Sequence, residues 1–284
     1  MKSIPIVKLL LFLLSSAATA FISSAQTPAP RQLTLIHPDD PDFDTLLNGN
    51  FTGVDNLDGY SAIRPYLVLL RNDTAHSIRA YAIAWDIQSS NRMVSRLGDE
   101  FVQRHQEPRT RLRAFTPGEI RLVSALFDLS PEEYKSRLPG IIKLLPGWTA
   151  HPPFSSTNIK SVSASLDAII YDDGAYAGPD HFLFLTKYQC IRAAERDLGE
   201  SLLKLMDSKA SDQEILALLQ QSAKAGLTAN TSGRDRESIC ALYRGEEAQA
   251  LLARYRSGGM DSLMTRAWAL TQYPREILTR ISSE

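Results

Sequence analysis

The sequence predicts an α+β protein in which an antiparallel β-sandwich is followed by an all-α helical region. From about residue 32 to residue 171, apolar side chains recur mainly at every second position, as they do in half-buried strands. After residue 180 they recur at intervals of about 3.6 residues, which is typical of amphipathic helices. Polar loops rather than regularly placed helices separate the predicted strands, and this favours antiparallel pairing over a doubly wound sheet.

The first 25 residues are expected to be a cleaved export signal. A positively charged start is followed by an apolar run from Leu9 to Ile22, and small residues lead to a cleavage position after Ala25. The apolar run is shorter than the roughly 20 residues that cross a bilayer as a helix. An uncleaved anchor and a cut after Ala20 remain alternatives. We therefore expect the protein in a periplasm, a cell envelope or the medium.

The organisation predicted beyond the signal is a sandwich-like domain over residues 26–180 and an α-helical domain over residues 181–284. The composition is that of a globular protein, with 44% hydrophobic and 22% charged residues and a formal net charge of −1. Charge is nearly balanced in both halves, whereas a nucleic-acid-binding protein usually has a basic excess. We expect no nucleic-acid partner and no membrane span after signal cleavage.

Five strands are predicted before residue 171. The clearest covers residues 161–171, where alternation places one set of side chains on a single buried face: Val162, Ala164, Leu166, Ala168 and Ile170. The other predicted strands cover residues 32–36, 66–71, 78–87 and the segment that follows Pro117-Gly118. Residues 66–70 form a continuous apolar run, which is typical of a strand covered on both faces.

The segments 66–71 and 78–87 are predicted to form a hairpin, because Asn, Asp and Ser between them favour turns. In the second segment one face is expected to consist of Tyr81, Ile83, Trp85 and Ile87, and the opposite face of Ala80, Ala82 and Ala84. Trp85 falls where immunoglobulin domains bury a core tryptophan. The cysteine pair of those domains is absent from this region, so the sandwich is expected to be at most immunoglobulin-like.

Short helices are predicted near residues 43–47 and after Ser130-Pro131, where a capping residue precedes a proline. In the C-terminal part, one helix is predicted from Phe184 to about residue 205. A capping box at Ser211-Asp212-Gln213-Glu214 opens a second helix. A third is predicted over residues 235–255, closed by Gly258-Gly259, and Asp261 is expected to cap a fourth that Pro274 kinks or ends.

The chain has two cysteines, Cys190 and Cys240, both in predicted helices. In an exported protein they could form a disulfide between two packed helices. They could equally be two buried thiols that behave as small apolar residues. The sequence leaves both alternatives open.

No common catalytic motif is present: the sequence has no G-x-S-x-G, no H-E-x-x-H, no phosphate-binding glycine loop and no C-x-x-C. The five histidines are far apart in the chain and are interpreted as solvated or structural: His37, His76, His105, His151 and His181. The sequence therefore predicts no catalytic residue, no cofactor and no metal ligand.

Two charged patterns have alternative interpretations. Asp172-Asp173-Gly174, followed by Gly178-Pro179-Asp180, is interpreted as turns that end the last strand, with a Ca²⁺ site as the alternative. A row of arginines in a predicted extended segment is interpreted as the charged edge of a sheet, with an anion-binding patch as the alternative. This row consists of Arg109, Arg111 and Arg113.

The strand and turn residues of segments 69–83, 165–174 and 178–180 resemble those of uncharacterised exported bacterial proteins. That resemblance implies an immunoglobulin-like sandwich core, a helical C-terminal region and an extracytoplasmic location. It implies no activity and therefore no site residue.

The function expected from these observations is that of an exported, non-enzymatic binding or structural module of the bacterial cell envelope. Its partner would be a protein or another envelope component. The alternative is an exported hydrolase with a non-standard site, built from Asp167, Asp172 or Asp180 and a histidine that folding brings close. A third hypothesis is a structural module stabilised by Ca²⁺.

Overall fold

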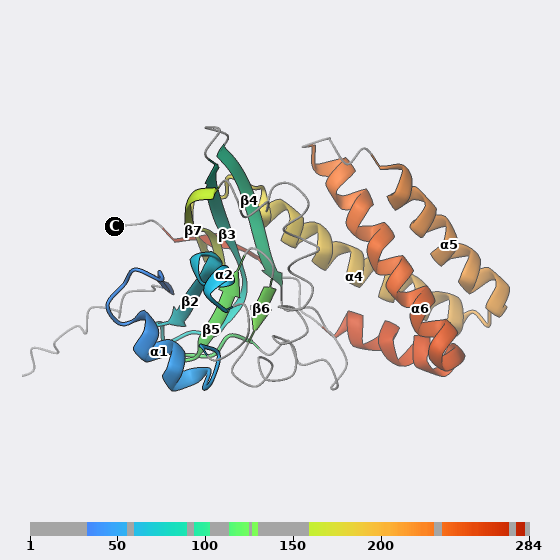
Figure 1. Cartoon of the computed structure of the whole chain (residues 1–284). Coiled ribbons are helices and arrows are strands. Elements are labelled where there is room, and N and C mark those ends of the chain that lie inside the picture. The colour runs from blue at the N-terminus through green and yellow to red at the C-terminus, as the bar shows by residue number, and fades with distance from the viewer. Residues whose placement is uncertain are drawn as a thin grey trace, which may run out of the picture. The chain divides into compact units, whose positions relative to one another are not determined.

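The computed structural model describes residues 33–55, 60–89, 94–102, 114–124, 127–129, 159–229, 235–272 and 277–281. All of them belong to one compact unit. The fold is α+β, with antiparallel sheets in the N-terminal part and helices in the C-terminal part (Figure 1). The expected signal peptide lies outside the described residues, as does the helix predicted after Ser130.

The first sheet has four antiparallel strands in the order β1-β2-β5-β6. They are β1 (Leu33–Ile36), β2 (Leu67–Asn72), β5 (Ile120–Ser124) and β6 (Phe127–Leu129). The predictions of strands over 32–36, over 66–71 and after Gly118 are confirmed. In β2, Leu67 and Leu69 pack with helix α1 (Phe43–Asn50), while Val68 and Leu70 pack on the other face. This burial of both faces explains its continuous apolar run.

The second sheet has the strand order β4-β3-β7-β8-β9. Its strands are β3 (Ile78–Ser89), β4 (Val94–Val102), β7 (Ile159–Tyr171), β8 (Ala175–Ala177) and β9 (Thr279–Arg280). The strands pair antiparallel, except that β9 runs parallel to β8. Because β9 comes from the C-terminal end of the chain, the C-terminal part is helical but not all-α.

The predicted hairpin of residues 66–71 and 78–87 is wrong, although both strands exist. β2 pairs with β1 and β5, whereas β3 pairs with β4 and β7 in the other sheet. The loop between them therefore connects the two sheets. Alternation of apolar residues fixes which face of a strand is buried, but it does not select the neighbouring strand.

The two sheets share one hydrophobic core, as two packed sheets do. The first sheet contributes Leu33, Val68, Leu70 and Val123, and the second contributes Ile78, Tyr81, Ile83, Trp85, Ile169 and Tyr171. The prediction that Tyr81, Ile83 and Trp85 share a face is confirmed. On the opposite face of β3, Ala80 and Ala82 pack with Phe184 and Tyr188 of helix α4 (Phe184–Asp207). These small side chains leave room for the two rings.

A β-bulge at Asp167 interrupts the alternation of β7. Ala82 pairs with Ala168 while the next residue, Ile83, pairs with Leu166, so Asp167 is an extra residue in β7. The single buried face predicted from Val162 to Ile170 is therefore wrong beyond Leu166, because one extra residue reverses the two faces. Before the bulge, the core-facing residues are Val162, Ala164 and Leu166; after it they are Ile169 and Tyr171, while Ala168 and Ile170 pack with α4.

The predicted C-terminal helices are confirmed as α4, α5 (Asp212–Thr228) and α6 (Arg236–Thr271). The capping box of α5 is present: the Glu214 N–H donates to Ser211 Oγ, and the Ser211 N–H donates to Glu214 Oε2. The third and fourth predicted helices form one element that is broken at Gly259, where φ is +69°. No helix in the described part of the chain combines the length and apolar character needed to span a bilayer.

The three helices bury a core of their own, formed mainly by leucine and alanine side chains. α5 and α6 approach most closely at Gly226 and Gly245. A Cβ atom added to either glycine would lie 2.4 Å from the Cα atom of the other. Two glycines thus allow the two helix backbones to touch.

Candidate functional site

Two buried polar side chains hold the loop between β2 and β3. The Asn72 amide donates to the carbonyl oxygens of His76 and Phe115, each at 2.9 Å. Its Oδ1 accepts from the Thr74 N–H (3.1 Å) and from the Thr74 hydroxyl (2.7 Å). Thr74 Oγ1 in turn accepts from the His76 N–H at 3.1 Å. The backbone on both sides of the His76 side chain is therefore fixed from inside the protein.

The His76 ring lies against the turn between β7 and β8. Its Nδ1 is 3.3 Å from Asp172 Oδ1 and 3.9 Å from Asp173 Oδ2. The other oxygen of Asp172 accepts a hydrogen bond from the Ser77 N–H at 3.3 Å. The other oxygen of Asp173 accepts one from the Ala175 N–H at 2.9 Å. Each carboxylate is therefore anchored through one oxygen and presents the other to the imidazole.

This cluster lies at the surface, since its side chains are 35% (His76), 43% (Asp172) and 37% (Asp173) exposed. Within the described ranges it is the one group of three or more His, Cys, Asp or Glu side chains whose candidate ligand atoms all lie within 4.8 Å of one another. The alternative interpretation of the sequence places the two aspartates together with Asp180 in a Ca²⁺ site. The third side chain beside them is instead that of His76.

A second histidine meets the carboxylate of the bulge residue. Asp167 is 1% exposed and accepts from the backbone N–H groups of His181 (2.9 Å) and Phe182 (3.1 Å). His181 Nδ1 is 3.0 Å from Asp167 Oδ1, while the His181 side chain is 59% exposed. A buried carboxylate behind an exposed imidazole fixes the orientation of the ring, and a general base can be built in this way. The same carboxylate also ties the turn before α4 to the sheet.

Asp180 takes part in that turn rather than in a cluster of ligands. Its carboxylate accepts from the Leu185 N–H at 3.1 Å in the first turn of α4, and burial raises the pKa of Asp180 above its ordinary value. Its backbone N–H donates to the Asp167 carbonyl at 2.9 Å. Gly178 permits this approach, because a Cβ there would lie 2.4 Å from the Asp167 oxygen. Residues 178–180 therefore lie in the connection between β8 and α4.

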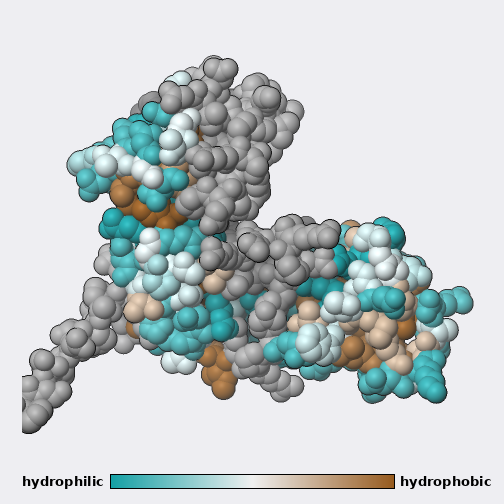
Figure 2. Space-filling view, turned by 90° about the horizontal axis from the view of Figure 1, so that it is seen from below, coloured by the Kyte–Doolittle hydropathy of each residue, from teal (hydrophilic) through white to brown (hydrophobic). Residues whose placement is uncertain are grey.

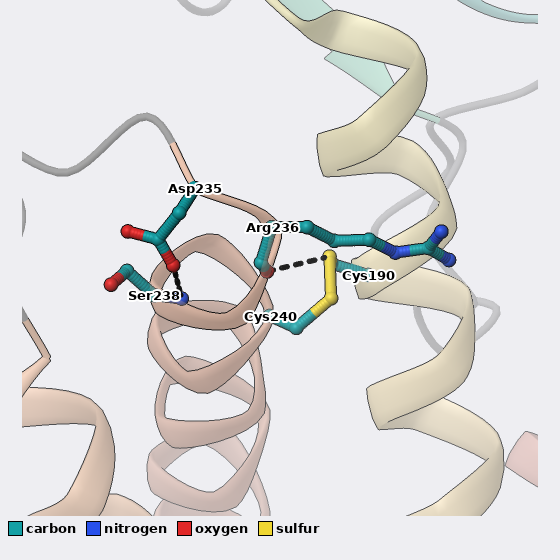
Figure 3. The surroundings of a disulfide bond; sticks show 5 residues. All are labelled: Cys190, Asp235, Arg236, Ser238 and Cys240. Atoms are coloured by element: carbon teal, nitrogen blue, oxygen red, sulfur yellow. Dashed lines mark hydrogen bonds between the residues drawn. A yellow bond between two sulfur atoms is a disulfide. The ribbon is translucent and has the colours of Figure 1, made fainter.

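Cys190 of α4 and Cys240 of α6 form a disulfide bond (Figure 3). Their Cα atoms are 4.6 Å apart. Next to the bond, the Asp235 carboxylate accepts from the Ser238 N–H at 2.8 Å and so caps the start of α6. The bond therefore fixes the N-terminal part of α6 to the first half of α4.

Several residues singled out in the sequence lie outside the described residues: Arg109, Arg111, Arg113, His105 and His151. His37 follows β1, and its backbone N–H donates to Asp40 at 2.6 Å.

Few large apolar side chains are exposed on the described surface, and two of them, Met264 and Trp268, lie one helical turn apart on α6. The large ones are Leu227, Met264, Trp268 and Ile277, from α5, from α6 and from the segment before β9. In the view of Figure 2, the coloured surface is mostly hydrophilic and its hydrophobic areas are small. A few exposed apolar residues are normal on a protein surface and do not by themselves define a binding face.

Comparison of the chain with known protein families, with curated proteins and with solved structures finds no match. The cluster of His76, Asp172 and Asp173 and the pair of His181 and Asp167 are therefore interpreted from their geometry.

The sequence could have indicated the His76 cluster if the partner of each strand had been known. His76 lies just before β3 and Asp172 lies just after β7. When two such strands pair antiparallel, the start of one lies beside the end of the other. The missing information was the pairing of β3 with β7, because the expected hairpin assigned β2 to β3 instead.

Proposed function

We propose that this protein is an exported, non-enzymatic binding or structural module of the bacterial cell envelope, with an immunoglobulin-like sandwich. The strand orders β1-β2-β5 and β4-β3-β7-β8 support this proposal. They correspond to the orders A-B-E and C′-C-F-G of immunoglobulin variable domains. β6 departs from the pattern, since it follows β5 in the chain, whereas immunoglobulin strand D precedes strand E.

Trp85 also favours an immunoglobulin-like core. It lies in β3, which corresponds to strand C, and it is 1% exposed within the core shared by both sheets. The disulfide joins two helices instead of the two sheets. Because disulfides persist mainly in oxidising compartments, this bond supports export together with the signal-like first 25 residues.

The observation that carries the binding role is the pair of loops at one end of the second sheet. The β2–β3 and β7–β8 loops correspond to the B–C and F–G loops, which bind antigen in variable domains. Here they are joined by the Asp172 N–H, which donates to the Ser77 carbonyl at 2.8 Å. Exposed side chains on loops held by a rigid scaffold are a common basis of recognition.

The experiment is capture from the native cell envelope with a tagged protein, with chemical cross-linking and with a chelator present throughout. The test variant combines His76→Ala with Asp172→Ala, and the control combines Gln213→Ala with Gln221→Ala on the exposed surface of α5. We expect one envelope component to be enriched by the wild type and by the control but lost from the loop variant. No reproducible component, or equal capture by the loop variant, would contradict the proposal.

A second candidate function is that of an exported hydrolase, because folding does bring a histidine to Asp167 and another to Asp172. Of the two pairs, His181 with the buried Asp167 has the geometry of an oriented general base. A panel of ester, peptide, glycoside and phosphate substrates tests it. Hydrolysis by the wild type that His181→Ala abolishes would favour the enzyme, and no hydrolysis in any of the four classes would exclude it.

A further inference from the structure

We propose that His76, Asp172 and Asp173 form a binding site for a divalent transition-metal ion, of which Zn²⁺ is the natural probe. The donor set is one imidazole nitrogen and two carboxylate oxygens, which converge from the β2–β3 loop and the β7–β8 turn. Imidazole and carboxylate groups are both common Zn²⁺ ligands, and three protein ligands with a water in the fourth position form an open site. This proposal goes beyond the binding role and does not require it.

The distances within the cluster suit a small ion. Two ligand atoms at about 2.0–2.2 Å from a tetrahedral Zn²⁺ lie roughly 3.3–3.6 Å from each other. His76 Nδ1 is already 3.3 Å from Asp172 Oδ1 and 3.9 Å from Asp173 Oδ2, and all three ligand atoms lie within 4.8 Å. A modest rotation of the aspartate side chains is therefore enough to reach the bound geometry.

Neighbouring protein groups hold the side chains of Asp172 and Asp173 in place, as they do for the ligands of known metal sites. A carboxylate that binds a metal usually also accepts a hydrogen bond from another protein group, which fixes its orientation. Here the Ser77 N–H holds Asp172 and the Ala175 N–H holds Asp173. The His76 ring also has an edge contact with buried Tyr171, with the ring centroids 6.3 Å apart. The three side chains are thus held close to the bound arrangement before any ion arrives.

The same donor set argues against Ca²⁺. Ca²⁺ binds six to eight oxygen ligands, whereas this cluster offers two carboxylate oxygens and one imidazole nitrogen. Asp180, the further carboxylate that a calcium site would need, instead accepts from the Leu185 N–H at the start of α4. A site with one nitrogen and two oxygens is expected to prefer Zn²⁺ strongly over Ca²⁺.

The test is calorimetric titration of the purified, chelator-treated protein with ZnCl₂. We expect one Zn²⁺ per chain in the wild type, with the affinity reduced at least tenfold in His76→Ala and in Asp172→Asn. Asp172→Asn keeps an oxygen that can accept from the Ser77 N–H, so the loop contact is retained. The matched control is His37→Ala, which removes a histidine close to Asp39 and Asp40 instead. We expect this variant to bind Zn²⁺ with the wild-type affinity. Millimolar CaCl₂ is expected to change the Zn²⁺ affinity less than twofold.

Thermal unfolding gives a second measurement and reports whether each variant folds. Zn²⁺ should raise the Tm of the wild type and of His37→Ala, because an ion that binds the folded state stabilises it, but not the Tm of the two site variants. If either variant melts much earlier without Zn²⁺, Asp173→Asn replaces it. No one-to-one binding by the wild type, unchanged binding by His76→Ala, or displacement of Zn²⁺ by Ca²⁺ would overturn the proposal. Since no partner is present, failure of the envelope role leaves this result unaffected.

Discussion

The crossing of α5 and α6 allows a stability prediction with a defined magnitude. A Cβ atom added to Gly226 would lie 2.4 Å from the Cα of Gly245, 3.1 Å from its nitrogen and 3.1 Å from the Ala241 carbonyl oxygen. Contacts of a Cβ shorter than 3.0 Å are essentially never observed, and ordinary contacts begin near 3.4 Å. All three neighbours are backbone atoms, so no side chain can rotate away. Gly226→Ala must therefore push the two helices apart by about 1 Å.

Two opposing terms set the effect of Gly226→Ala on the free energy of unfolding. Alanine is favoured over glycine within a helix by up to about 1 kcal/mol. Overpacking of a close contact, including the backbone shifts that it forces, costs about 1–3 kcal/mol and occasionally more. We expect a net loss of about 2 kcal/mol, which corresponds to a fall in Tm of about 4–8 °C for a chain of this size.

The matched control is Gly49→Ala in α1, where no heavy atom lies within 4 Å of the added Cβ. This variant gains helix propensity without a clash, so its stability should rise by up to about 1 kcal/mol. The double variant of Gly226 and Gly245 should lose less than the sum of the two single variants, because both disturb one contact. Thermal unfolding followed by circular dichroism checks these expectations. A Gly226→Ala variant that melts at or above the wild-type temperature would refute the steric argument.

Three further predictions follow from single contacts. Thiol titration of the unfolded, unreduced protein should find no free thiol, and replacing Cys190 and Cys240 by serine should cost about 4 kcal/mol, because the bond closes a loop of 50 residues. Hydrogen bonds from the Ser211 N–H and hydroxyl lower the pKa of the Glu214 carboxyl below its ordinary value of 4.5, so the stabilisation that this carboxylate gives to the start of α5 is lost as the pH falls through that lowered pKa. Ser211→Ala removes the hydroxyl but keeps the N–H donor, so the pKa measured by NMR titration should move only part of the way back toward 4.5. Trp85→Ala in the sandwich core should cost about 3–5 kcal/mol in denaturant unfolding.

Local signals were sufficient to predict most of the described elements. The spacing of apolar residues predicts β1, β2, β3, β5 and β7 together with the start of α4. The Ser211 to Glu214 capping box predicts the start of α5, and the break at Gly259 matches the predicted end of a helix. Each of these signals lies within one strand or within one or two turns of one helix. The interactions that cause it, such as the burial of one face or a capping hydrogen bond, are between residues close together in the sequence.

Three features depended on contacts between distant residues. The hairpin prediction failed because β2 and β3 each have two better partners in different sheets. β9 has only two residues, and its pairing with β8 is fixed by distant backbone contacts, such as that of the Thr279 N–H with the Gly174 carbonyl. The His76 cluster joins side chains that are 96 positions apart. A pattern within one sequence segment contains no information about such partners.

The bulge at Asp167 explains why the candidate metal site depends on a residue outside it. Without the extra residue, alternation from Leu166 would bury Ala168 and Ile170 in the shared core and would turn Tyr171 outward. With it, Tyr171 lies in the core and contacts His76, and the chain leaves the sheet with the Asp172 N–H on the Ser77 carbonyl. The bulge is stabilised from the other side, since Asp167 accepts three hydrogen bonds from the turn before α4. The turn into the helical part and the loops at the end of the sheet are thus positioned by the same irregularity of β7.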